Sequence, residues 1–129
     1  MQPAHTRHHI AIVEDDQGAR DAMAFLLEVA GYHVAKYASA QEFLSDYDPH
    51  RVIGLVLDQH MPGVTGLELA EHLRAAGRTL PILLVTARPS ALLPARAAEL
   101  GINNVLEKPS INEGLMAFCA QLDRRPGPS

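Results

Sequence analysis

Five short apolar runs, each followed by a segment with helical periodicity, constrain the fold of this chain more than any other feature of its sequence. The three clearest runs span residues 10–13, 52–57 and 82–85 and contain no charged residue. A strand that is continuously apolar is typical of a parallel sheet covered by helices on both faces. Weaker strand signals lie at 34–37 and 105–106. The alternation predicts a doubly wound α/β domain with a parallel sheet.

The segments between these runs carry helix start and stop signals. Asp16 precedes an apolar stripe that ends at Gly31, which predicts an N-cap and a C-terminal stop. Residues 39–42 (Ser-Ala-Gln-Glu) and 65–68 (Thr-Gly-Leu-Glu) have the form of capping boxes. A last helix is predicted from residue 110 onward. Its expected inner face consists of Leu115, Met116, Phe118, Cys119 and Leu122.

Length and composition bound the class of protein. With 129 residues, 47% of them hydrophobic, the chain fits one domain with a real core. The net charge of −4 argues against non-specific nucleic-acid binding. No apolar run is long enough to span a membrane. Cys119 is the only cysteine and residues 1–9 lack the apolar core of a secretory signal, which together favour a cytoplasmic location.

The predicted domain is flanked by two polar ends. Residues 1–9 are expected to be a disordered N-terminal segment, and residues 10–122 to form the folded domain. Residues 123–129, which contain the run Arg-Arg-Pro-Gly-Pro-Ser, read as a tail or the beginning of a linker.

Polar side chains follow the carboxyl ends of four of the predicted strands. Glu14 and Asp15 follow the first strand, and Asp58 ends the third. Thr86 ends the fourth, and Lys108 follows the fifth. Because functional groups of doubly wound sheets gather beyond the carboxyl ends of the strands, we expect these five side chains on one edge.

The chemistry of such a group points to a phosphoryl site. Crowded carboxylates repel one another unless a cation intervenes, and Mg²⁺ is the usual partner of oxygen ligands. A phosphoryl group on Asp58 is then within reach of the metal, the Thr86 hydroxyl and the Lys108 ammonium. Each residue alone has an ordinary explanation: a strand-end hydroxyl, a solvated cation, or acids that favour a helix N-terminus. Their joint occurrence on one edge favours the site.

Four motifs carry a resemblance to a known family. They are "VEDD" at 13–16, "LVLDQHMPG.TG" at 55–66, "LLVTA" at 83–87 and "LEKP" at 106–109. In this order they resemble the receiver domain of two-component response regulators, closest in look to the FixJ type. The resemblance covers about residues 10–122. It implies a CheY-like, flavodoxin-like (βα)5 sandwich with the parallel strand order 2-1-3-4-5.

The resemblance implies a role for each residue at the predicted edge. Asp58 matches the phospho-acceptor, Thr86 the switch hydroxyl and Lys108 the lysine that contacts the phosphoryl group. The matching Mg²⁺ ligands are the carboxylates of Glu14, Asp15 and Asp58 and the main-chain carbonyl of His60.

The implied function is a phosphorylatable receiver of a phosphorelay. A histidine kinase or a phosphotransfer protein would donate the phosphoryl group, and a downstream protein or a C-terminal output domain would receive the signal. The resemblance implies no classical enzyme, but a receiver that would catalyse its own phosphoryl transfer and its own dephosphorylation. Neither nucleic acid nor a membrane is an expected direct partner, and homodimerisation is left open. Two alternatives remain: a receiver-like interaction module that does not switch and, ranked last, a small phosphatase.

Three features depart from the family pattern: Val105, the segment 86–101 and His60. Val105 occupies a place that is often aromatic, which predicts an altered output surface. Pro94 predicts a fourth helix that starts late, near that residue, with Leu92 and Leu93 on the preceding loop. These leucines either cover the core or form a patch for a partner.

Two further side chains near the predicted site have open roles. Arg88 either reaches the phosphoryl oxygens or is solvated. The His60 side chain is expected over the mouth of the site, where it either tunes hydrolysis of the acyl phosphate or has only a surface role.

Overall fold

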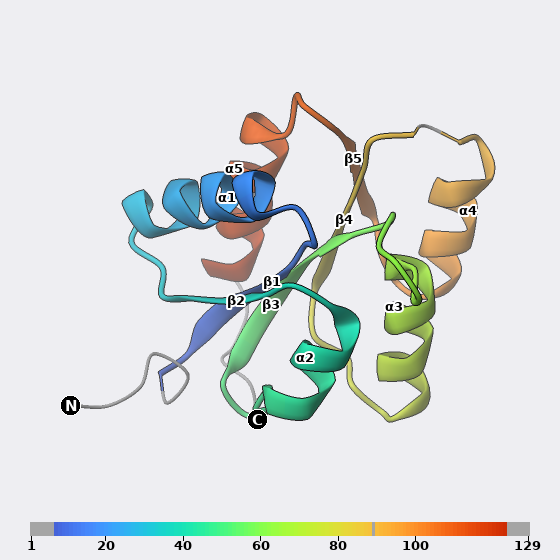
Figure 1. Ribbon diagram of the computed structural model, residues 1–129, viewed down its shortest axis with the longest axis horizontal. Coiled ribbons are helices and arrows are strands. Elements are labelled where there is room, and N and C mark those ends of the chain that lie inside the picture. Colours follow the sequence, from blue (N-terminus) through green and yellow to red (C-terminus); the bar gives the residue numbers. More distant parts are fainter. Residues whose placement is uncertain (1–6, 89, 124–129) are drawn as a thin grey trace.

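Five parallel strands and five helices alternate along the chain in a computed structural model that describes residues 7–88 and 90–123 (Figure 1). The elements are β1 His9–Val13, α1 Gln17–Val29, β2 Val34–Tyr37, α2 Ala40–Asp46, β3 Val52–Asp58, α3 Gly66–Ala75, β4 Ile82–Thr86, α4 Leu92–Glu99, β5 Asn104–Glu107 and α5 Asn112–Asp123. Helices α1 and α5 cover one face of the sheet, and α2, α3 and α4 cover the other (Figure 1).

The strand order is β2-β1-β3-β4-β5, with every neighbouring pair parallel. This topology confirms the predicted doubly wound fold. The register pairs Val13 with Leu57, Asp58 with Val85, and Thr86 with Glu107. The carboxyl ends of β1, β3, β4 and β5 therefore lie at one edge of the sheet.

Successive residues of the central strands are buried on opposite faces. Ile10, Ile12, Val56, Leu83 and Val85 belong to the apolar cluster with α1 and α5. Ala11, Val13, Leu55, Leu57 and Leu84 belong to the cluster with the other three helices. Because side chains alternate across a strand, two covered faces require apolar residues at every position. The uninterrupted apolar runs in the sequence have this cause.

The predicted helix ends are largely those observed. The Asp16 carboxylate accepts from the Ala19 N–H at 2.8 Å, and Thr65 with Glu68 forms a complete capping box. Gly31 follows α1 with φ +102°, a conformation that side chains with a Cβ rarely adopt. The expected box at α2 is only half present: the Ser39 hydroxyl accepts from the Glu42 N–H, but the Glu42 carboxylate accepts from Ala38 rather than from Ser39.

Two expectations about helices were wrong. Helix α4 begins at Leu92, not near Pro94, so that Pro94 lies in its first turn. Proline is tolerated there because the first N–H groups have no partner within the helix. Leu93 is 7% exposed and covers the core, whereas Leu92 is 71% exposed. Met116, expected on the inner face of α5, is 38% exposed.

Some expectations concern residues at the ends of the chain. Residues 1–6 and 124–129 lie outside the described residues, as does Pro89. The expected disorder of residues 1–9 and the expected tail at 123–129 therefore remain predictions, although β1 already includes His9. Within 7–88 and 90–123, none of the helices has the length and apolar character that crossing a membrane requires.

Candidate functional site

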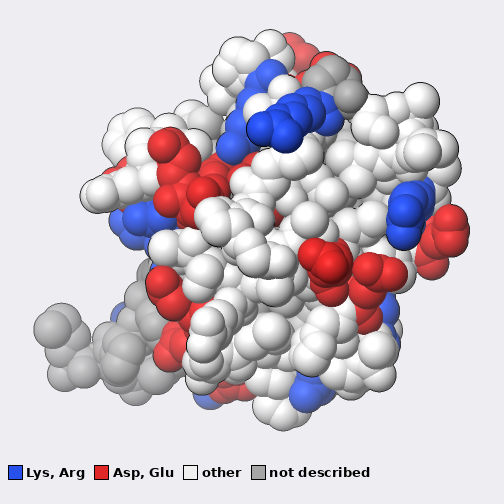
Figure 2. Space-filling model, turned by 45° about the vertical axis from the view of Figure 1, so that its right-hand side comes forward, with Lys and Arg blue, Asp and Glu red and all other residues white. Residues whose placement is uncertain are grey.

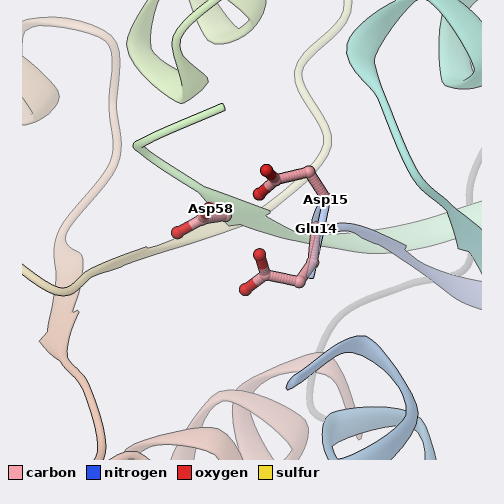
Figure 3. Close-up of side chains that lie close together, drawn as sticks. All are labelled: Glu14, Asp15 and Asp58. Carbon is pink, nitrogen blue, oxygen red and sulfur yellow. The ribbon is translucent and has the colours of Figure 1, made fainter. Parts of the chain in front are cut away.

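Three carboxylates meet where β1 and β3 end. Glu14 and Asp15 directly follow β1, and Asp58 is the last residue of β3. One oxygen of each lies within 4.8 Å of the others. Figure 3 shows all three carboxylate groups open toward the same side of the strand ends. Glu14 is 1% exposed and Asp58 3% exposed, while Asp15 is exposed, so the cluster opens to solvent at Asp15.

Lys108 brings the opposing charge from the far side of the site. Its Nζ lies 2.5 Å from Glu14 Oε1 and 3.3 Å from Asp58 Oδ1. Its main-chain N–H donates to the Thr86 carbonyl at 2.8 Å, which ties the chain after β5 to the end of β4. The ammonium therefore bridges two acids that come from different strands.

Burial and charge oppose one another in this group. Burial raises the pKa of Glu14, and the nearby Asp58 charge raises it further, against the hydrogen bonds from Lys108 and the Asp16 N–H. Burial lowers the pKa of Lys108, but the hydrogen bond to Glu14 and the charge of Asp58 outweigh it, so that this pKa lies above its usual value. Three carboxylates facing one ammonium leave an excess of negative charge, which suits a divalent cation.

The loop between β1 and α1 is held by its own side chains. The Arg20 guanidinium donates to the Glu14 carbonyl at 2.9 Å. The Asp16 N–H donates to Glu14 Oε2 at 3.2 Å. These contacts fix the main chain that carries Glu14 and Asp15.

Strand β3, which carries Asp58, ends against the start of α3. The Gln59 N–H donates to the Val85 carbonyl at 2.8 Å, and the Gly66 N–H donates to the Gln59 carbonyl at 3.0 Å. The Gln59 side chain also accepts from the Leu67 N–H at 2.8 Å. A Cβ on Gly66 would lie only 2.6 Å from the Asp58 carbonyl oxygen. The position of Asp58 thus depends on a close approach that only glycine permits.

Thr86 ends β4 and is 1% exposed. Its hydroxyl contacts His60 Nε2 at 3.0 Å, donates to the Arg88 carbonyl at 3.1 Å and accepts from the Arg88 N–H at 3.1 Å. The His60 side chain was expected at the mouth of the site, but its contact with Thr86 was not predicted. Arg88 is exposed, and its main chain meets the threonine.

The five side chains predicted for the strand-end edge come from the ends of four strands. Glu14, Asp15, Asp58 and Lys108 lie together, whereas Thr86 stands at the same edge bound to His60 and Arg88. Val105, at the place where an aromatic residue is common, is half-buried and packs against the core cluster below α4. Gln59 was missed because nothing in its sequence neighbourhood shows that it caps a helix seven residues away.

The surface charge outside the site is mixed. The face drawn in Figure 2 carries several separate acidic and basic groups with large uncharged areas between them, rather than one continuous basic surface. The expectation that this chain does not itself bind nucleic acid rests on the net charge of −4 and stays a prediction.

Comparison with known proteins gives a consistent result. The family model described as "Response regulator receiver domain" matches residues 10–119. The transcriptional regulatory protein FixJ of Bradyrhizobium diazoefficiens is 36% identical over 96% of this chain and 60% of its own length. The response regulator MprA of Mycobacterium avium is 36% identical over 92% of this chain and 52% of its own length. The chain thus spans little more than half of these relatives.

Solved structures share the fold. The non-phosphorylated HemR receiver domain of Leptospira biflexa superposes with a TM-score of 0.83 at 28% identity, covering 95% of this chain and 99% of that one.

Proposed function

The chain belongs to the response regulator receiver domain family of two-component systems, and on this premise we propose that it is a phosphorylatable switch whose acceptor is Asp58. The observation that carries the proposal is the arrangement around this carboxylate. Two further acids lie within 4.8 Å of it, and the Lys108 ammonium lies 3.3 Å from Asp58 Oδ1. A nucleophile with charge neutralisation beside it is what phosphoryl transfer needs.

The donor set fits Mg²⁺. All ligands offered are oxygens, and the negative charge exceeds that of the one ammonium, which is the preference of a hard divalent ion. We assign the ligand role to the carboxylates of Glu14, Asp15 and Asp58 and to the main-chain carbonyl of His60. When bound, the ion would neutralise charge on the transferring phosphoryl oxygens.

The transfer itself can be stated atom by atom. A carboxylate oxygen of Asp58 attacks phosphorus of a phosphohistidine on a histidine kinase or phosphotransfer protein. The new P–O bond forms as the P–N bond breaks, and the donor imidazole keeps the electron pair and takes a proton from water. The Lys108 ammonium stabilises the equatorial oxygens. The signal ends by hydrolysis. Water attacks phosphorus as the bond between phosphorus and the Asp58 oxygen breaks, which gives the Asp58 carboxylate and inorganic phosphate.

Switching follows from the new charge. A phosphoryl group adds about −1.5 to −2 charge and three acceptor oxygens on a short tether. Thr86 and Lys108 can contact these oxygens in one arrangement of the loops after β4 and β5 better than in another, which biases α4, β5 and their loops. A shift from 1:99 to 99:1 needs about 5.5 kcal/mol. Two hydrogen bonds to a charged group, at roughly 1.5–3 kcal/mol each, come near this value.

The partners are a kinase or phosphotransfer protein upstream and an output downstream. The relatives FixJ and MprA are longer than this chain, and FixJ is named a transcriptional regulator. We propose that the signal passes either to a separate protein in the cytoplasm or to an output domain linked beyond the receiver.

Intact-mass measurement with Mg²⁺ and a small phosphodonor such as acetyl phosphate tests the proposal. We expect one phosphoryl adduct on the wild-type chain, and none on Asp58→Asn or after chelation of Mg²⁺. Asp21→Asn is the matched control, because Asp21 is an exposed acid on α1 paired with Lys36, away from the cluster. A folded wild-type chain that takes up no adduct would refute the proposal.

A non-switching interaction module is the second candidate, and Val105 favours it. Without an aromatic side chain at this place, a ring movement on β5 cannot report phosphorylation. If the chain takes up a phosphoryl group but the amide NMR signals of α4 and β5 stay unchanged, the chain is better described as a non-switching interaction module.

A further inference from the structure

The Thr86 hydroxyl has used its whole hydrogen-bonding capacity. A hydroxyl has one proton to donate and two lone pairs to accept. The proton goes to the Arg88 carbonyl and one lone pair takes the Arg88 N–H, both at 3.1 Å. His60 Nε2, at 3.0 Å, is therefore left to donate to the second lone pair. The imidazole completes a closed set of contacts around a side chain that is 1% exposed.

The histidine is itself held in place on both sides along the chain. Its preceding residue, Gln59, is bonded to β4 through the Val85 carbonyl and to α3 through Leu67. Its following residue, Met61, is buried in the core cluster with α3. The His60 ring thus extends from a fixed main chain toward the end of the neighbouring strand.

This arrangement bears on the switch. A phosphoryl group on Asp58 offers only acceptor oxygens, so Thr86 can bind it only by donating its single proton. That proton must leave the Arg88 carbonyl. A movement of the Thr86 oxygen toward Asp58 would also break its contact with His60.

We propose that His60 is a positioning residue that holds Thr86 in the unphosphorylated arrangement and so opposes activation. The inference rests on the proposed function, because it concerns the switch hydroxyl of the same site. Any bond that exists only in the unphosphorylated arrangement shifts the equilibrium toward it. Loss of one ordinary hydrogen bond predicts a shift of about two- to tenfold.

The first measurement needs no phosphoryl chemistry. Urea unfolding of the wild type, His60→Ala, Thr86→Val and the double variant, without Mg²⁺ or phosphodonor, gives the coupling between the two side chains. We expect His60→Ala to lower the folding equilibrium constant more in the presence of the Thr86 hydroxyl than in the Thr86→Val background, by about two- to tenfold. Equal losses in both backgrounds overturn the proposal.

The second measurement follows activation. Beryllofluoride with Mg²⁺ serves as the phosphoryl mimic, and the amide NMR signals of β4 and α4 report the apparent affinity. We expect His60→Ala to tighten the apparent affinity for beryllofluoride by about two- to tenfold. The affinity of His60→Gln should lie nearer that of the wild type, because the glutamine amide can donate a hydrogen bond. In the Thr86→Val background, His60→Ala should not change the affinity.

The outcomes distinguish failure of the proposed role of His60 from failure of the proposed function. A gain in affinity that persists without the Thr86 hydroxyl means that His60 acts on access to the site and not through Thr86, and overturns the proposal. An unchanged affinity in His60→Ala overturns it as well. If the wild type itself does not respond to beryllofluoride, the proposed function fails and the inhibitory role of His60 falls with it, whereas the urea measurement still decides whether the contact exists.

Discussion

Substitution of Gly66 by alanine should damage both the fold and the position of the chain at Asp58. The new Cβ would lie 2.6 Å from the Asp58 carbonyl oxygen and 2.9 Å from Leu84 Cδ1. The nearest atom belongs to the main chain of a central strand, so it cannot turn away as a side chain can. Relief requires α3 and the end of β3 to separate by several tenths of an ångström.

The magnitude follows from two opposing effects. Overpacking in a tightly packed interior costs about 1–3 kcal/mol. Replacing glycine by alanine in a helix returns at most about 1 kcal/mol, and less in the first turn where Gly66 lies. We expect a net loss of about 1–2 kcal/mol in the free energy of unfolding. With a urea m-value near 2 kcal/mol/M, the midpoint falls by about 0.5–1 M.

Gly18→Ala is the matched control. Gly18 lies in the first turn of α1, and its Cβ would lie 3.4 Å from Asp16 Oδ2, an ordinary contact. The free energy of unfolding of Gly18→Ala should stay unchanged or rise by up to about 1 kcal/mol. Both variants are compared by urea unfolding followed by circular dichroism, and by the rate of labelling with acetyl phosphate, which should fall only for Gly66→Ala. If Gly66→Ala is as stable as Gly18→Ala, the claim that α3 packs tightly against the end of β3 is wrong.

Three further predictions concern buried titratable groups. Burial raises the pKa of Glu14 above its unfolded value, so its contribution to stability is greatest below about pH 4.5 and is lost as the pH rises through the folded pKa. The free energy of unfolding of the wild type relative to Glu14→Gln, measured with chelator present, should therefore fall as the pH rises above about 4.5, and a rise would contradict the prediction. Burial, with the Asp123 charge, raises the pKa of the Cys119 thiol to about 11. The thiol should therefore react with a disulfide reagent at pH 8 at least about a hundredfold more slowly in the folded chain than in the urea-unfolded chain. Comparable rates would show that the thiol is accessible in the folded chain. Tyr37→Phe removes the hydroxyl that donates to Asp46 Oδ2 at 2.7 Å and should lower the free energy of unfolding by about 0.5–1.5 kcal/mol; no loss in urea unfolding would mean that water replaces the bond fully.

The features that could be predicted from the sequence are the strands, most of the helix ends and the edge of the sheet at which the strands end. Apolar runs and caps report local periodicity, and the parallel order then fixes which strand ends share an edge. For this reason Asp58 and Glu14 could be placed near each other although they are distant in sequence. The start of α4 was missed because proline is compatible with any place in a first turn, so that Pro94 allowed a start two residues earlier.

Contacts that depend on side-chain rotamers could not be predicted. The bond between His60 and Thr86 joins residues 26 positions apart, and no local pattern records which way either side chain turns. The same holds for Gln59, which reaches the start of α3. Met116 lies at the border of the apolar stripe of α5, where a small rotation of the helix decides exposure.

The pairing of Lys108 with Glu14 joins positions 94 residues apart. A nascent chain that has not yet produced β5 already contains every acid of the cluster but lacks the ammonium that balances them. The charge balance around Asp58 is therefore completed only after β5 and the residue that follows it have been made.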